Sequence, residues 1–534
     1  MKKEYRSERF GVVWLIMLFM ALANTFTAFA QVKQATVLVN GISCDLEQGI
    51  LKVEFVTPDV VRVQYTGENT FMGNGTDVCL PRAVDNLVRW VYTPNPDCYL
   101  LKSDSLIVRV DLSTASITYL DEEGGLLLQE DQNIPRISEK RVTKQVIYDE
   151  HSKHIEKTAD GDKEIKNVLR YDTIGHTWKY RINFKWQPLE ALYGWGSHME
   201  DYMNLRGKEL YLCQHNLKAM VSVLNSTAGY GLLFDAGCAM MFKDNSEGSF
   251  VELEAAKQID YYFMKGKTMD AVVANYRMLT GNSPMMPLYL FGYIQSKERY
   301  VSSDDLINTL KEYRQRQIPI DMIVQDWNYW PEGQWGNMSM NPKFYPDKRK
   351  LADEIHSLHA KLMISIWPNA MNCPQHEEFK RKGWLLSSTP VYDAFNPLAR
   401  KLYWNYANNE FFDNGFDAWW CDASEPLDAD WTFMKDGYGA DNHRQRWELN
   451  TNLLNSVLGA ERSQLYSLYH AKGIYENQRS TNEDKRVVNL TRSSYAGQQR
   501  YSTITWNGDT YATWQSFAQM IPAGLNFMST GCPY

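Results

Sequence analysis

Hydrophobic and polar residues alternate along the first half of the chain in short runs that turn residues separate. ILKVEFVTPDVVRVQYT (50–66) alternates around a Pro-Asp turn, and SLIVRVDLSTASITYLDEEGGLLLQE (105–130) repeats the scheme around a Gly-Gly turn. Alternation with a period of two, broken by turns, is typical of antiparallel strands. Residues 31–280 are therefore predicted to form a mostly antiparallel β-sandwich. Within it, the polar, lysine-rich residues 136–170 predict an exposed hairpin or loop.

The pattern changes after GNSPMMP (281–287), which is a predicted linker. Apolar strand-like runs now alternate with amphipathic helical segments, such as 304–317 and 347–360. Apolar strands joined by helices indicate a parallel sheet buried on both faces, and their repetition over residues 287–534 predicts a (β/α)8 TIM barrel. We expect seven strands and not eight, at 288–295, 321–327, 361–368, 416–422, 486–492, 501–509 and 524–530. The fold class is thus α/β with an all-β N-terminal domain, and the barrel is expected to be incomplete at its C-terminal end.

Several predicted strands end in polar or aromatic residues, and a TIM barrel places its chemistry at the C-terminal ends of its strands. The apolar run in AWWCDASEP (418–426) leads directly into Asp422, and YSTITWNGD (501–509) ends on Asp509. Two carboxylates that face each other across a barrel mouth are the groups that glycoside hydrolysis requires. Aspartate also commonly caps helices and turns, so spacing and composition alone leave that alternative open.

Longer segments carry a resemblance to a known family. AWWCDASEP resembles the nucleophile segment of glycoside hydrolase family 31, the retaining α-glucosidase and α-xylosidase family. LTRSSYAGQQRYSTITWNGDTYATW (490–514) resembles the acid/base segment of that family. LYGWGSHMEDYMNLRGKELYLCQHN (192–216) is similar to its N-terminal sandwich, including a loop that reaches toward the active site.

The resemblance implies a role for individual residues. Asp422 matches the catalytic nucleophile and Asp509 the general acid/base. The other matches are expected to bind or enclose the sugar: Asp326, Trp327, Trp367, Arg492 and Trp506. Trp506 precedes the acid/base residue, and packing alone also explains it. Glu425 is expected to hydrogen-bond and not to catalyse. The implied mechanism requires no metal and no cofactor.

The implied activity is that of an exo-acting α-glycosidase on oligosaccharides. FGYIQSKERY (291–300) and MISIWPNAM (363–371) favour an α-xylosidase that removes α-xylosyl units from plant-type oligosaccharides, and an α-glucosidase is the alternative. In the family, the segment that GLNFMSTGCPY (524–534) resembles is followed by a last barrel strand, β-domains and a further pocket histidine. A truncated chain is therefore expected, and an inactive carbohydrate-binding remnant also stays open.

Composition and charge exclude some classes of protein. The net charge of −8 and the absence of a basic block argue against a nucleic-acid partner. The 17 Trp and 32 Tyr suit sugar rings, although a large β-rich core would also use them. The eight cysteines include no CxxC pair, so a zinc ribbon is excluded, and Cys79 with Cys98 is a possible disulfide. His151 and His154 have a ligand-like spacing, but we expect them to be solvated. No oligomeric state is predicted.

The N-terminus has the pattern of an export signal. A mainly basic start, an apolar run (11–23) and the small residues of AFA (28–30) predict a signal peptide over residues 1–30. The apolar run is short for a membrane span of about 20 residues. The mature protein is therefore expected to be secreted or periplasmic, without a membrane anchor.

This prediction has a direct test. We expect N-terminal sequencing of the exported protein to begin at Gln31, because cleavage after AFA follows the small-residue rule of signal peptidases. An intact Met1 terminus in a membrane fraction would contradict it.

Overall fold

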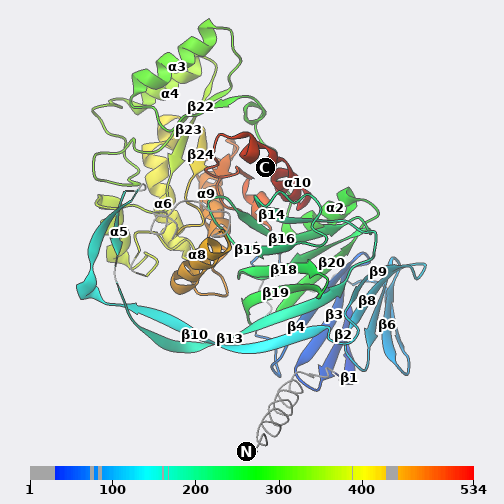
Figure 1. Cartoon of the computed structure of the whole chain (residues 1–534). Helices are drawn as coiled ribbons and strands as arrows, with labels where there is room; N and C mark the ends of the chain where they lie inside the picture. The colour runs from blue at the N-terminus through cyan, green and yellow to red at the C-terminus, as the bar shows by residue number, and fades with distance from the viewer. Residues whose placement is uncertain are drawn as a thin grey trace, which may run out of the picture.

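The computed structural model describes residues 31–72, 77–81, 87–158, 161–165, 167–387, 389–427 and 443–534. The predicted signal peptide, residues 1–30, lies outside the described residues. Among the helices that are described, none combines the length and the apolar character that crossing a membrane requires. Figure 1 shows a β-rich half and a helix-covered half joined side by side.

One sheet of the β-rich half has eight antiparallel strands. In spatial order they are β1 (Val32–Val37), β2 (Gly41–Leu46), β3 (Ile50–Thr57), β4 (Val60–Thr66), β20 (Ile259–Lys265), β17 (Tyr230–Phe234), β16 (Ala219–Ser226) and β14 (Leu192–Ser197). β3 and β4 pair around Pro58 and Asp59, which confirms the hairpin predicted for residues 50–66.

The second sheet has ten strands and packs against the first. Its strands are β15 (Glu209–Leu212), β18 (Met240–Asn245), β19 (Gly248–Ala256), β13 (Val168–Lys185), β9 (Leu126–Glu130), β8 (Ile117–Asp121), β7 (Leu106–Asp111), β6 (Cys98–Ser103) and β5 (Trp90–Pro94), with β10 (Arg136–Tyr148) beside β13. Tyr119 of β8 stacks on Phe263 of β20 with 4.0 Å between ring centroids, so the two sheets share one core. The predicted β-sandwich is confirmed.

A long two-stranded arm leaves the sandwich. β10 and β13 pair from Arg136 and Ile182 to Tyr148 and Val168, which confirms the hairpin predicted for residues 136–170. Near its tip are η1 (Glu150–Ser152), β11 (His154–Thr158) and β12 (Gly161–Ile165). Figure 1 shows the arm curving below the helical half toward α5 (Pro374–Lys382). His151 and His154 are both exposed.

The helical half contains a parallel sheet whose strands follow chain order. They are β21 (Ile294–Gln295), β22 (Met322–Gln325), β23 (Lys361–Ile366), β24 (Ala418–Cys421), β25 (Asn489–Thr491) and β26 (Thr503–Thr505). The helices of this half are η2 (Leu288–Phe291), α3 (Ser303–Gln315), α4 (Lys348–Ser357), α5, α6 (Pro397–Glu410), η3 (Phe412–Asn414), α8 (His443–Leu458), α9 (Tyr466–Thr481), η6 (Gln498–Tyr501) and α10 (Trp514–Ser529). The remaining helix, α2 (Met269–Thr280), packs on the core of the sandwich. α3 and α4 begin at Ser302 and Asp347, whose side chains cap them, and they confirm the two predicted amphipathic helices.

The strand predicted at 524–530 is wrong, because residues 524–529 lie in α10 and Thr530 is the C-cap of this helix. A short apolar run does not distinguish a strand from a helix segment, and the Thr513 cap starts a helix that continues through this run. The prediction for 288–295 is also largely wrong, since Leu288–Phe291 form a 3-10 turn. The described part of the barrel sheet therefore has six strands and not seven.

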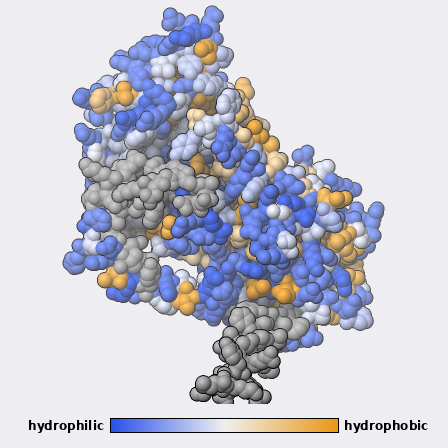
Figure 2. Space-filling view, in the orientation of Figure 1, coloured by the Kyte–Doolittle hydropathy of each residue, from blue (hydrophilic) through white to orange (hydrophobic). Residues whose placement is uncertain are grey.

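The exposed side of α10 is apolar. Residues that recur at helical spacing there are exposed: Trp514, Phe517, Ile521, Leu525 and Met528. Leu288 and Phe291, which precede the first strand of the sheet, are also exposed. Figure 2 shows hydrophobic surface on the side of the molecule where Figure 1 places the C-terminus. Both outer strands of the six-stranded sheet are thus accompanied by exposed apolar groups.

Alternating side chains give the two faces of the parallel sheet different neighbours. Residues such as Ile323, Ile364 and Trp419 pack against the helices. The other face has its own apolar cluster, made of Met322, Val324, Met363, Ala418, Val488 and Leu490. All eight cysteines are buried and free, so the possible Cys79–Cys98 disulfide is not formed.

Candidate active site

Five of the predicted site residues directly follow neighbouring strands of the parallel sheet. The last paired residues of β23, β24, β25 and β26 are Ile366, Cys421, Thr491 and Thr505, which lie next to one another in register. The next residues along the four strands are Trp367, Asp422, Arg492 and Trp506. Alternation places these four on the face of the Met322–Leu490 cluster, and Asp326 follows β22 on the same face.

The side chain of Arg492 joins three carboxylates. One terminal nitrogen of its guanidinium lies 2.9 Å from Asp422 Oδ1 and 3.3 Å from Asp509 Oδ2. Its Nε donates to Glu425 Oε1 at 2.7 Å. Arg492 and Glu425 are buried, whereas the side chain of Asp509 is 66% exposed. The structure therefore brings Asp422 and Asp509, 87 residues apart in sequence, to one cation.

Ser424 and Glu425, which follow Asp422 in sequence, both form buried hydrogen bonds. Glu425 bonds to Arg492, as its expected hydrogen-bonding role requires. Ser424 Oγ pairs with the Thr491 hydroxyl at 2.9 Å and accepts the Ser493 N–H at 2.9 Å. These buried polar groups fix the loop after β24 to the loop after β25, which holds Asp422 against Arg492.

The environment of Asp422 acts in two directions on its ionisation. Burial raises the pKa of its carboxyl, and the nearby charge of Asp509 also raises it. The guanidinium of Arg492 lowers this pKa, and the Ala423 N–H donates to Asp422 Oδ1 at 2.7 Å. Arg492 is thus the group that favours an ionised Asp422 inside a buried site.

Asp326 is a third carboxyl close to this pair. Burial, with the charge of Asp422 as the next cause, raises the pKa of Asp326 to about 7. The Trp327 N–H donates to Asp326 Oδ1 at 2.8 Å, and a hydrogen bond from Ser365 also favours the ionised form. Asp326 is therefore able to hold or release a proton near neutral pH.

Aromatic side chains stand beside the carboxylates. Trp327 and Trp367 both contact Trp335, with ring centroids 5.6 and 5.2 Å apart, and Trp367 Nε1 donates to Ser365 Oγ at 3.1 Å. Trp506 differs, because its ring packs 4.8 Å from Trp420 against the apolar cluster of the sheet face. Its contacts are those of a packing residue, the alternative that the sequence left open.

Asn216 was not singled out from the sequence. Its Nδ2 donates to Asp509 Oδ2 at 2.7 Å, and the Asp509 N–H donates to Asn216 Oδ1 at 2.9 Å. Asn216 belongs to the sandwich, at the end of the segment expected to reach toward the active site. Gly508, next to Asp509 in sequence, marks this contact. Its φ is +77°, and a Cβ atom at this position would lie 1.8 Å from the Asn216 carbonyl oxygen. Only glycine allows so close an approach of two backbones.

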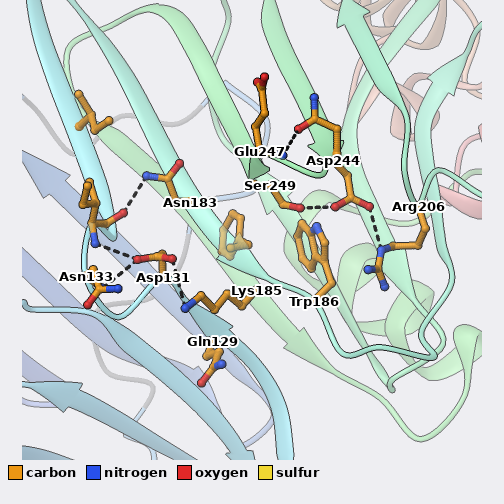
Figure 3. A pocket seen from close by; sticks show the side chains of 15 residues that line it. Gln129, Asp131, Asn133, Asn183, Lys185, Trp186, Arg206, Asp244, Glu247 and Ser249 are labelled. Atoms are coloured by element: carbon orange, nitrogen blue, oxygen red, sulfur yellow. Dashed lines mark hydrogen bonds and ion pairs between the residues drawn. The ribbon is translucent and has the colours of Figure 1, made fainter.

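A hollow lies on the sandwich, between the β9–β10 loop and the β18–β19 turn (Figure 3). It has a volume of about 740 Å³ and contains none of the predicted site residues. Its carboxylates already have separate partners, since Asp131 pairs with Lys185 and Asp244 with Arg206. The arrangement at Arg492, in which two aspartates share one cation, is absent from this hollow.

Comparisons with known proteins identify the family of this chain. The model of the glycosyl hydrolases family 31 TIM-barrel domain matches residues 283–534. An uncharacterized family 31 glucosidase, ORF2 of Pseudescherichia vulneris, is 30% identical over 67% of this chain and 67% of its own length. The chain belongs to glycosyl hydrolase family 31.

Two further proteins are similar along nearly the whole chain. The α-xylosidase of Saccharolobus solfataricus is 31% identical over 91% of this chain. The match covers 61% of the length of that relative. A crystal structure of a family 31 α-xylosidase from a soil metagenome, complexed with xylose, has a TM-score of 0.75 and 24% identity, and the match covers 94% of this chain and 71% of that one.

The raised pKa of Asp326 predicts how stability depends on pH. The carboxyl titrates near 3.8 when unfolded and near 7 when folded, so the folded state binds more protons between these values. The free energy of unfolding therefore falls as pH rises through this window. We expect Asp326→Asn to be more stable than the wild type by roughly 2–4 kcal/mol at pH 8, and to differ little at pH 4.

Thermal unfolding at the two pH values measures this effect. Asp353→Asn is the matched control, because Asp353 is exposed on α4 of the same domain. A difference between wild type and Asp326→Asn that is the same at pH 4 and pH 8 would refute the prediction.

Proposed function

We propose that this protein is an exo-acting, retaining α-glycosidase, and that its preferred substrates are α-xylosides of plant-type oligosaccharides. The observation that carries this proposal is the sharing of Arg492 by Asp422, which directly follows β24, and Asp509, which lies in the loop after β26. Retaining glycosidases hold their two carboxyl groups about 5–5.5 Å apart, and inverting ones about 6.5–9.5 Å. Two carboxylates within 2.9 and 3.3 Å of one nitrogen support the shorter arrangement.

In the proposed mechanism Asp422 attacks the anomeric carbon and Asp509 protonates the departing glycosidic oxygen. Asp509 then removes a proton from the water that hydrolyses the glycosyl-enzyme. The ion pair with Arg492 supports the ionised state that the nucleophile needs. Asp326 and Arg492 would bind sugar hydroxyls, while Trp327 and Trp367 would enclose the ring.

The choice of an α-xyloside rests on relatives and on sequence segments. The Saccharolobus solfataricus relative and the structural neighbour with bound xylose are both named α-xylosidases. The Pseudescherichia vulneris relative is named a glucosidase, which keeps an α-glucoside as the second candidate. We also propose that the mature protein is exported and begins at Gln31, with a sandwich over 31–280 and a barrel over 287–534.

A second candidate function is carbohydrate binding without turnover. This chain spans 61% of the length of the Saccharolobus solfataricus relative, so the activity of that relative is a proposal for it. An assay of sugar release together with a measurement of oligosaccharide binding separates the two candidates, because a carbohydrate-binding protein binds the oligosaccharide and does not turn it over.

The catalytic pair predicts two different kinetic defects in the full gene product. Asp422→Ala removes the nucleophile, so turnover of every substrate should be lost. Asp509→Ala should slow glycosides with poor leaving groups by about 10²–10⁴-fold, but activated aryl glycosides far less, because good leaving groups need little protonation. Azide should partly restore turnover of Asp509→Ala by attacking the glycosyl-enzyme.

Kinetics on matched aryl and alkyl glycosides check this assignment. Asp353→Ala, on the exposed side of α4, serves as the control and should leave both rates unchanged. Equal losses of Asp509→Ala on both kinds of substrate would remove Asp509 from the acid/base role.

The proposed preference for α-xylosides predicts which sugar is released faster. Xylose should be released from p-nitrophenyl α-xyloside faster than glucose from the α-glucoside. Xylose lacks the C6 hydroxymethyl, and a difference of about one methylene in a pocket is worth only about 1–3 kcal/mol, so measurable cross-activity is expected. A kcat/KM that strongly prefers the glucoside would favour the second candidate substrate.

A further inference from the structure

We infer that Asn216 of the sandwich is the positioning residue for Asp509, and that it holds the Asp509 carboxyl so that Oδ1 carries the transferable proton. This inference rests on the proposed acid/base role of Asp509. It begins with the two reciprocal bonds between the residues, at 2.7 and 2.9 Å. One bond fixes the side chain of Asp509 and the other fixes its backbone, so together they restrain both the carboxyl and the loop that carries it.

The two oxygens of Asp509 have different surroundings. Oδ2 accepts from Asn216 Nδ2 at 2.7 Å and from Arg492 at 3.3 Å. Both donors are N–H groups, which cannot accept a hydrogen bond from a proton on Oδ2. Oδ1 is the oxygen that these two donors do not occupy. The proton transferred to the glycosidic oxygen is therefore assigned to Oδ1.

Asp509 depends on these contacts because its side chain is largely exposed. It lies in the loop after β26, with 66% of its side-chain surface accessible. A carboxyl in such a loop would otherwise adopt several rotamers. General acid catalysis needs the proton within hydrogen-bonding reach of the leaving oxygen, so rotamer freedom directly lowers the rate.

Asn216 can restrain Asp509 because its own turn is held on both sides. His215 and Lys218 exchange backbone hydrogen bonds of 2.9 Å, which places Asn216 in a tight turn. After Asn216, the buried Lys218 ammonium lies 3.7 Å from the centre of the Trp447 ring of α8 and bonds to Glu200. The turn is thereby tied to the barrel side of the molecule.

Before Asn216, Gln214 makes the corresponding attachment. Its N–H donates to Gln464 Oε1 at 2.6 Å, and its Nε2 donates to the Ser494 carbonyl at 2.6 Å. Ser493 Oγ donates to Gln214 Oε1 at 2.8 Å. Ser493 and Ser494 directly follow Arg492, so one turn of the sandwich contacts both loops whose side chains meet at Asp509.

The test uses Asn216→Ala and the isosteric Asn216→Asp in the full gene product. Asn216→Ala should lower kcat for substrates with poor leaving groups by roughly ten- to a hundredfold, and change activated aryl glycosides only slightly. KM and the melting temperature should stay close to wild type. Asn216→Asp keeps the size but replaces the amide donor by a carboxylate, so its loss should equal or exceed that of Asn216→Ala.

Asn245→Ala is the control, since Asn245 is an asparagine of the same sandwich that bonds only to Glu209 and Glu247 among its described side-chain contacts. It should leave the leaving-group dependence unchanged. The inference is overturned if Asn216→Ala slows both substrate classes equally, or neither, while Asp509→Ala retains its leaving-group dependence. If Asp509→Ala itself lacks that dependence, the proposed function fails instead, and the two failures are distinguishable.

Discussion

The candidate site depends on the ion pairs that the buried guanidinium of Arg492 forms with carboxylates. Three carboxylates converge on it, and the two that are largely buried, Asp422 and Glu425, would be costly to bury without a cation. Arginine suits the position because its planar fork donates in several directions at once, whereas a lysine ammonium is a point charge. For this convergence β24, β25 and β26 have to end side by side. Their register achieves this, because the last paired residues of the three strands lie next to one another.

The site belongs to two parts of the chain. The parallel sheet supplies Asp326, Asp422 and Arg492, while the sandwich supplies Asn216 from nearly 300 residues before Asp509 in sequence. The contacts of Gln214, Asn216 and Lys218 explain why the sandwich is more than a cover for the barrel. Its turn supplies hydrogen bonds to a residue whose side chain is 66% exposed.

The sequence predicted the parts of the site that follow apolar strands. Asp422 and Arg492 could be placed because a short apolar run ended on each, and the parallel sheet then required them to be neighbours. The strand at 524–530 was wrong because a run of that length fits a helix as well. Asn216 could not be found from spacing, since its partner lies in another domain. The segment 192–216 was expected to reach the site, but within the barrel only Gly508 marks where the two backbones meet.

The exposed apolar side of α10 affects how molecules of this protein associate with one another in solution. Burying one large apolar side chain contributes about 1.5–3 kcal/mol of free energy. A surface that exposes Trp514, Phe517, Ile521 and Leu525 therefore favours association with other apolar surfaces in water. The opposite side of the helix is already used, because Asn526 accepts the Gly194 N–H of the sandwich at 2.8 Å. Molecules that meet through the outer side gain free energy without rearranging the fold, so self-association rises with protein concentration unless another polypeptide covers this helix.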